Sequence, residues 1–214
     1  MPVSLMRFVD FLKTEGEGKP KGQRTRLHII AAASVLLDEI EPADLLVSKV
    51  CAAASISNGT FYIYFKDRHV LFQELLQIFI SFLQERMKAS GEGENDRIKA
   101  ATDAYFHLFK NHRGLMRCLL HHHLINNDVK TAFHRLNKEW IDRVVRAKVD
   151  EAMRLGKPAE PAELKRRAYA LGGMVDQYLS NMFLSSDPDL LAVSTNDNQV
   201  IETLTEIWRR GMDL

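Results

Sequence analysis

Residues 47–76 constrain the fold of this chain more than any other segment. An Ala-rich segment stops at the turn formed by residues 55–57, and a second short segment, rich in aromatic and hydroxyl side chains, follows directly. A charged break at residues 66–68 leads into a long amphipathic pattern. Two short helices joined by a tight turn, with polar groups on the second, are what a helix-turn-helix requires.

Part of this stretch also fits a β-hairpin. Asn58-Gly59 is a common hairpin-turn dipeptide, and residues 61–65 alternate in the way typical of a strand. The residues Asn58-Gly59-Thr60 would also be a glycosylation sequon, but only in a secreted protein. Periodicity alone therefore leaves helix and strand open over residues 57–65.

Residues 54–71 match a known pattern. Ala54-Ser55-Ile56-Ser57 supplies a turn, Gly59-Thr60-Phe61-Tyr62-Ile63-Tyr64-Phe65 follows, and Arg68 and Leu71 come next. This pattern resembles the N-terminal DNA-binding domain of the TetR family of transcriptional regulators, and Arg26 with residues 29–33 is similar to the family's first helix. The resemblance covers about residues 22–76 and favours the helical interpretation. Beyond residue 76 only helical layout and length agree.

Two residues depart from the family pattern. The turn position that is usually Gly is Ser55, which is expected to adopt a left-handed backbone at a cost of roughly 1 kcal/mol. The position that usually holds a capping Thr is Leu46, so the helix that follows lacks an obvious side-chain cap.

The predicted fold class is all-α. Helical periodicity and stop signals predict helices at about residues 23–39, 68–89, 96–111, 128–155, 161–184 and 198–210, another around residues 115–120, and a loop at 185–197. With the resemblance, this is a three-helix helix-turn-helix head on a larger helical body, about nine helices in all. The predicted domains are an N-terminal extension and linker (1–21), the DNA-binding domain (22–68) and an effector-binding and dimerisation domain (69–214). Residues 1–15 fit a short amphipathic helix that could dock on the body or reach along DNA.

The resemblance also assigns DNA contacts. It implies base contacts in the major groove from Asn58, Gly59, Thr60 and Ile63, phosphate contacts from Tyr62, Tyr64 and Arg68, and further contacts from Ser48 and Lys49. Ser57 is placed to cap the recognition helix. Asn suits adenine, and Ile and the Thr methyl suit a thymine methyl, so A·T pairs are expected. Two heads are needed for tight and selective binding, which implies a homodimer on a near-palindromic operator.

The body is expected to bind a small, mainly apolar effector and to dimerise. The candidate pocket residues are Phe82, Tyr105, Phe106, Phe109, Met116, His123, Trp140, Met174 and Tyr178. Each of them could instead be plain core. The candidate dimer interface, implied by the family's pairing of its last two helices, is Leu171, Val175, Leu179, Met182, Leu204 and Trp208. Gly172-Gly173 suits close approach of a neighbouring backbone, a pocket floor or a kink.

Composition excludes several classes of protein. The net charge of +1 provides no global attraction for nucleic acid, so the basic surface must be local, as at Lys19, Lys21, Arg24, Arg26 and His28. No apolar run approaches the roughly 20 residues that cross a bilayer, and charges interrupt the N-terminal apolar stretch, so a cytoplasmic location without membrane contact is expected. Cys51 and Cys118 lie in apolar helical patterns and are expected to be buried thiols.

Other functions have weaker support. No nucleophile elbow, phosphate loop or HExxH motif is present, so we expect no enzyme and no cofactor. Three consecutive histidines, His121–His123, point about 100° apart on a helix and cannot share one metal ion, so no metal site is expected. The alternative function is an all-α protein-interaction module without sequence-specific DNA binding.

Overall fold

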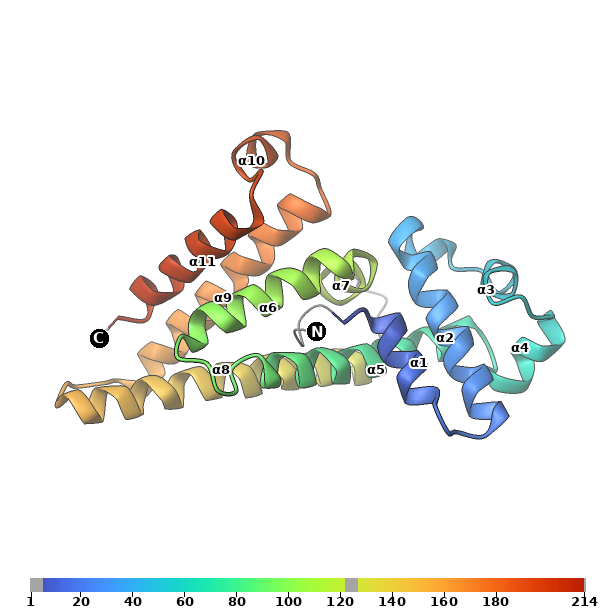
Figure 1. The fold of residues 1–214 in the computed structure, drawn as a ribbon, viewed down its shortest axis with the longest axis horizontal. Coiled ribbons are helices and arrows are strands. Elements are labelled where there is room, and N and C mark those ends of the chain that lie inside the picture. Colours follow the sequence, from blue (N-terminus) through green and yellow to red (C-terminus); the bar gives the residue numbers. More distant parts are fainter. Residues whose placement is uncertain (1–5, 122–126, 214) are drawn as a thin grey trace. The chain divides into compact units, whose positions relative to one another are not determined.

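The computed structural model describes residues 6–121 and 127–213. Its α-helices are α1 (Phe8–Gly16), α2 (Lys21–Glu39), α3 (Val47–Ala53), α4 (Asn58–Tyr64), α5 (Arg68–Ala89), α6 (Arg97–Asn111), α7 (Arg113–His121), α8 (Asn127–Leu155), α9 (Pro161–Phe183), α10 (Pro188–Val193) and α11 (Asp197–Gly211) (Figure 1). A 3-10 helix, η2, covers Pro42–Asp44. No residue in the two described ranges forms a strand, so the all-α prediction is confirmed and the hairpin alternative for residues 57–65 is wrong.

One predicted loop contains a helix. The segment 185–197 includes α10, and the described residues contain eleven α-helices, roughly consistent with the expected number of about nine. The Asp187 side chain accepts from the backbone N–H groups of Asp189 and Leu190, both at 3.0 Å, and Pro188 occupies the first helical position. An Asp N-cap followed by Pro is a helix-start signal that the short apolar run had obscured.

The chain divides into two compact units, unit 1 (Met1–Arg86 and Leu108–Ala132) and unit 2 (Met87–His107 and Phe133–Leu214). Helices α5, α6 and α8 each continue from one unit into the other. These units are groups of packed helices, and the functional boundary predicted at residue 68 stays a prediction.

Unit 1 has an aromatic and aliphatic core built on α5. Leu71, Leu75, Phe79 and Phe82 recur at helical spacing along α5, and all four are fully buried. Helix α1 packs beside α2 (Figure 1), and its Phe8 ring lies 5.2 Å from Phe79 and 5.4 Å from Phe82 between ring centroids. The N-terminal extension therefore docks on its own chain through α1.

Unit 2 is organised around α8, α9 and α11. Helices α9 and α11 run side by side (Figure 1). The Trp140 ring of α8 meets the Trp208 ring of α11 edge to face, with 5.0 Å between ring centroids. Side-chain caps fix two helix starts, since Glu160 accepts N–H groups at the start of α9 and Asn196 does so at α11.

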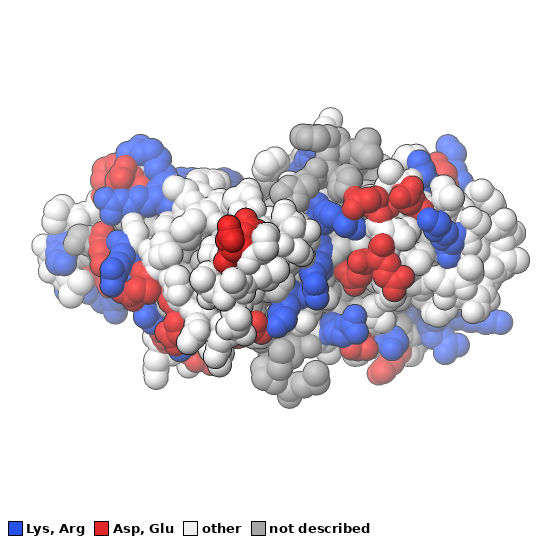
Figure 2. Space-filling model, turned by 90° about the horizontal axis from the view of Figure 1, so that it is seen from above, with Lys and Arg blue, Asp and Glu red and all other residues white. Residues whose placement is uncertain are grey.

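Charge is mixed on the surface. Figure 2 shows acidic and basic side chains interspersed over the visible face, in keeping with a net charge of +1. Among the described residues, no helix is both long and apolar enough to cross a membrane.

Candidate DNA-binding site

The turn between α3 and α4 is a left-handed helix cap. Ser55 has φ of 52°, the left-handed conformation expected from its place in the sequence. The backbone N–H of Ile56 donates to the Cys51 carbonyl at 3.0 Å, and that of Ser55 donates to the Ala52 carbonyl at 3.2 Å. These two bonds form a Schellman motif, which satisfies the last carbonyls of α3 and turns the chain into α4.

The two helices begin differently. Ser57 Oγ accepts from the Thr60 backbone N–H at 3.1 Å, so the predicted cap of α4 is confirmed. Leu46 precedes α3 and gives no side-chain cap, as its residue type implies. The stable start therefore belongs to α4, the helix predicted to enter the groove.

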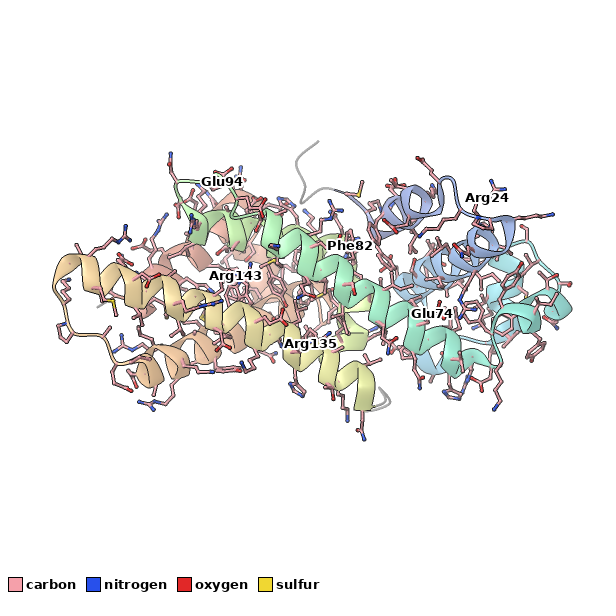
Figure 3. The ribbon with its side chains drawn as sticks, turned by 90° about the horizontal axis from the view of Figure 1, so that it is seen from below. Arg24, Glu74, Phe82, Glu94, Arg135 and Arg143 are labelled. Atoms are coloured by element: carbon pink, nitrogen blue, oxygen red, sulfur yellow. The ribbon has the colours of Figure 1, made fainter. Side chains whose placement is uncertain are left out.

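The inner face of α4 is anchored in unit 1. Phe61 and the residue that follows the helix, Phe65, are both fully buried, and their rings lie 5.6 Å apart. The Arg26 guanidinium sits 4.5 Å over the Phe65 ring and donates to the Tyr64 carbonyl at 2.6 Å. It also donates through Nε and Nη2 to both oxygens of Glu74 on α5, with 2.7 Å for the Nε bond (Figure 3 shows Glu74 on α5).

Arg26, on α2, therefore has a structural role: it holds the end of α4 in place beside α5. The hydrogen bond to Glu74 is the main cause that raises the pKa of Arg26, while burial opposes it and the Glu74 charge adds to it. The sequence places Arg26 among the local basic residues, and the prediction does not include Glu74. The sequence does contain a signal for this ion pair, because Glu74 is an acidic residue between the buried positions Leu71 and Leu75 of α5.

The outer face of α4 is open. Tyr62 is 58% exposed and Ile63 is 77% exposed, while Asn58 and Gly59 are also exposed and Thr60 is half-buried. A β-carbon added at Gly59 would meet only Ser57 Oγ, at an ordinary 3.7 Å. The chain's own packing therefore does not require glycine here, and it does not require an isoleucine at a position that faces solvent.

The remaining predicted contacts flank α4. Ser48 and Lys49 are exposed on the first turn of α3, and Ser57 is exposed at the turn. Tyr64 is half-buried, and its hydroxyl lies near Gly22 at the start of α2. Arg68 is half-buried and donates to the Ala43 carbonyl at 3.0 Å.

Basic and acidic residues lie at opposite ends of α2. Lys21 and Arg24 are exposed at the beginning of α2 (Figure 3 labels Arg24). The acids at the other end of α2 contact α7, since Asp38 accepts from the Gly114 N–H at 2.9 Å and Glu41 pairs with Arg117 at 2.8 Å. The exposed cations thus lie at one end of α2 and the acids at the other.

The predicted pocket residues are mostly buried. In unit 1, Phe82, Phe109 and Met116 are fully buried. In unit 2, Phe106 is fully buried, whereas Tyr105, Trp140, Met174 and Tyr178 are half-buried. His123 lies outside the described residues. A small cavity beside His112 and a groove of about 620 Å³ along α1 and α2 are both lined by other residues.

Two of these pocket candidates, Tyr105 and Tyr178, have polar partners in unit 2. The Tyr105 hydroxyl donates to an Asp176 carboxylate oxygen at 2.5 Å. Burial raises the pKa of Asp176 to about 6, although the Tyr105 hydrogen bond lowers it. Tyr178 has a polar partner too, because its hydroxyl lies 3.0 Å from Ser194 Oγ. Asp176 was missed because acidic residues on an otherwise mixed helix usually face solvent.

The predicted dimer-interface residues pack within the chain. Val175, Leu179, Met182, Leu204 and Trp208 are buried, and Leu171 lies beside Gly211 of α11. Their periodicity reflects the contact between α9 and α11 of one protomer. The other face of α9 is exposed at Tyr169, Ala170, Gly173 and Gln177, and α11 exposes Ile207.

Within the described residues, no group of three or more His, Cys, Asp or Glu side chains is arranged to hold a metal ion. His122 and His123 lie outside those residues, and His121 closes α7.

Comparison with known proteins identifies the second half of the chain. A family model described as "Transcriptional regulator EthR, C-terminal domain" matches residues 98–212, more than half of the sequence. The HTH-type transcriptional regulator EthR of Mycobacterium tuberculosis is 24% identical over 195 residues, which cover 89% of this chain and 88% of that protein.

Solved structures share the fold. FadR from Bacillus subtilis, determined in complex with stearoyl-CoA, has a TM-score of 0.65 at 18% identity and covers 86% of this chain and 98% of its own. A TetR-family regulator from Bordetella parapertussis has a TM-score of 0.65 at 16% identity, covering 86% and 93%. These proteins are named as transcriptional regulators and not as enzymes. With a helix-turn-helix at α3 and α4 and an EthR-type C-terminal domain, the chain belongs to the TetR family of transcriptional regulators.

Proposed function

We propose that this chain is a homodimeric repressor that binds a near-palindromic operator through α4 and leaves it when a small, mainly apolar effector binds. As a TetR-family member it is a ligand-responsive DNA-binding regulator, which argues against the interaction-module alternative. The observation that carries the proposal is the open face of α4 on a buried aromatic anchor.

The outer face of α4 has the chemistry of a groove-reading surface. Ile63 is 77% exposed, and an isoleucine there suits the methyl group of thymine. Gly59 leaves one position in the first turn of α4 without a side chain, which lets the helix approach the duplex closely. Asn58, exposed beside it, can accept and donate at the adenine edge.

The flanking side chains suit phosphates. Tyr62 is 58% exposed, and the Tyr64 hydroxyl lies next to the N-terminus of α2. Arg68 uses one N–H on the Ala43 carbonyl and has others to offer. Such contacts position a protein on the duplex but do not read its sequence.

Dimerisation is proposed through the exposed face of α9. Tyr169 and Ala170 lie one helical turn before Gly173, and a β-carbon at Gly172 or Gly173 would meet nothing within 4 Å. Two glycines in a helix interior cost roughly 1 kcal/mol each, with no partner in their own chain to explain them. Close approach of the same helix from a second copy would explain both, with Ile207 of α11 at its edge.

The effector is proposed to be largely apolar, with an acyl chain as the leading class. Aromatic and Met side chains contribute to the buried and half-buried interior of the body, as in Phe106, Trp140 and Met174. FadR of Bacillus subtilis, which shares the fold, is a regulator solved with stearoyl-CoA.

A titration of fluorescent DNA from the protein's own promoter region, repeated from 0.05 to about 0.3 M salt, tests DNA binding. We expect specific binding that survives at about 0.2 M salt, whereas non-specific association would be erased. Tyr62→Ala should weaken binding to all sequences alike, and Asn58→Ala should relax preference at particular base pairs. Arg143→Ala, an exposed change on α8, is the control (Figure 3). Uniform loss in both variants would contradict the assigned roles, and no specific binding would contradict the function.

Sedimentation at several concentrations tests the dimer. Gly173→Leu should dissociate it and reduce operator affinity, because the added side chain would separate the two backbones. Thr203→Leu, at an exposed position of α11, provides a matched change in size. A Gly173→Leu protein that remains dimeric would place the interface elsewhere.

A further inference from the structure

Helix α1 links three other segments of unit 1. Its Phe8 and Leu12 side chains are each 1% exposed, and the helix packs along α2, which precedes the DNA-reading helices. The Phe11 ring lies 5.2 Å from the Phe82 ring of α5. A third link joins the first residue of α1 to His112, in the turn between α6 and α7.

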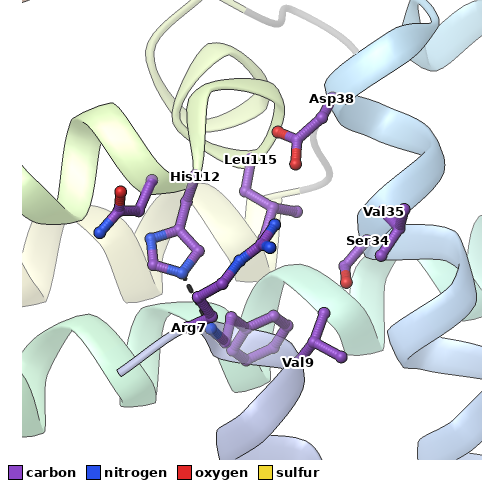
Figure 4. A pocket seen from close by; sticks show the side chains of 9 residues that line it. Arg7, Val9, Ser34, Val35, Asp38, His112 and Leu115 are labelled. Atoms are coloured by element: carbon purple, nitrogen blue, oxygen red, sulfur yellow. Dashed lines mark hydrogen bonds between the residues drawn. The ribbon is translucent and has the colours of Figure 1, made fainter. Parts of the chain in front are cut away.

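The link to His112 fixes the protonation state of the imidazole. The Phe8 backbone N–H, which can only donate, points to His112 Nε2 at 2.9 Å, as drawn in Figure 4. Nε2 must therefore carry a lone pair. His112 Nδ1 lies 2.8 Å from the Leu108 carbonyl, which can only accept, so Nδ1 carries the proton. Both contacts are satisfied only by the neutral ring.

A protonated ring would have little room to adapt. His112 is 5% exposed, and its ring lies 5.5 Å from both Phe79 and Phe82. The adjoining cavity has a volume of about 10 Å³, at the lower limit for a single water molecule. A proton on Nε2 would face the Phe8 N–H, donor against donor.

The charges around His112 come from two segments. Asp38 of α2 and Arg7, just before α1, both line the adjoining cavity (Figure 4), while α5 presents aromatic rings. Burial is the main cause that lowers the pKa of His112. The Leu108 carbonyl and Asp38 oppose that shift, and Arg7 adds to it.

We propose that α1 is a proton-sensitive latch: it stays docked on α2 and α5 while His112 is neutral, and it is released when His112 takes up a proton. Helix α1 contacts α2, which precedes the helix-turn-helix, and it also contacts α5 and the turn that follows α6. Both α5 and α6 continue into unit 2, so α1 connects the helix beside the DNA-binding head with helices that reach the effector-binding body. The consequence of release for DNA binding rests on the proposed function, whereas the latch itself does not.

The direction of the pH dependence follows from linkage. The docked state has the lower His112 pKa, so it binds fewer protons than the released state. Docking of α1 is therefore most stable at pH values above 6.5, the ordinary pKa of histidine. It weakens as the pH falls from 6.5 toward the lower pKa that His112 has in the docked form.

Amide hydrogen exchange of the full chain tests the latch. After correction for intrinsic exchange rates, protection of residues 8–16 should fall roughly fivefold to tenfold between pH 7.5 and 5.5, while protection of α9 should not. His112→Gln offers an acceptor that does not titrate, so its α1 protection should be independent of pH. His112→Phe removes the acceptor and should leave α1 less protected at both pH values. His134→Gln, at an exposed histidine of α8, should behave as the wild type.

Three results would overturn the latch: wild-type α1 protection that does not change with pH, a pH dependence that survives in His112→Gln, or wild-type protection in His112→Phe. Operator affinity of the same proteins at both pH values is read separately. If no operator is bound at either pH, the proposed function fails, and the exchange data still decide the latch.

Discussion

Replacement of Arg26 tests how α4 is held in place. The guanidinium makes a bond of 2.6 Å to the Tyr64 carbonyl, a two-pronged contact with Glu74 and a ring contact with Phe65. The Arg26 side chain is 37% exposed and that of Glu74 26%, so the ion pair is partly screened and contributes about 0.5–1 kcal/mol. The charged bond to the carbonyl contributes about 1.5 kcal/mol and the ring contact about 0.5 kcal/mol.

Arg26→Ala should therefore lower the free energy of unfolding by about 2–3 kcal/mol. In a chain of this size the midpoint of thermal unfolding should fall by roughly 5–10 °C. Arg26→Lys keeps the charge but cannot reach both Glu74 and Tyr64 with a planar fork, so it should lose about half as much. Circular dichroism melts and urea titrations measure both variants.

Arg24→Ala is the matched control, because Arg24 is exposed on the same helix and should change stability by less than about 0.5 kcal/mol. A double-mutant cycle with Glu74→Gln isolates the pair. An Arg26→Ala protein as stable as the wild type, or an Arg26→Lys protein indistinguishable from it, would refute the reasoning.

Three further variants test other contacts. Ser55→Gly should raise stability by about 1 kcal/mol in thermal melts, because Ser55 has a left-handed backbone at φ of 52°, and an unchanged melt would argue against strain there. Gly114→Ala should cost about 3 kcal/mol or more, since the new β-carbon would lie 2.0 Å from the Leu37 carbonyl oxygen, and a stable variant would show that α2 and α7 can separate cheaply. Asp176 has its pKa raised to about 6 by burial, so the folded state prefers the protonated form and loses stability as pH rises from about 4 through 6. Asp176→Asn should therefore gain about 1–3 kcal/mol relative to wild type at pH 8 but not at pH 4, whereas an equal difference at both pH values would contradict the buried charge.

The helical layout could be predicted because its signals are local. The stripe that includes Leu71 and Leu75 on α5, the Ser57 cap and the left-handed Ser55 all follow from residue type and spacing, and the structure has each of them. The ambiguity between helix and strand at residues 57–65 was resolved only by resemblance, because Phe61 and Phe65 suit one face of either element.

The partners of buried side chains could not be predicted in the same way. The contacts of Arg26 with Glu74 and of Phe8 with His112 join residues 48 and 104 positions apart, and no spacing rule connects them. The periodic apolar residues of α9 could face their own chain or a second copy. Leu179 is fully buried in a single protomer, so periodicity identified a contact face but not the partner.

Site-directed cleavage tests the central claim, that α4 lies in the major groove of an operator. Cys51 and Cys118 are both buried, so a cysteine introduced at the exposed Lys66, just after α4, can be labelled selectively with an iron chelate. The account predicts two cleavage clusters on promoter DNA, about one helical turn or ~34–36 Å apart, and none from a chelate at Arg143→Cys on α8. Scattered cleavage from Lys66→Cys, or the same clusters from Arg143→Cys, would contradict it.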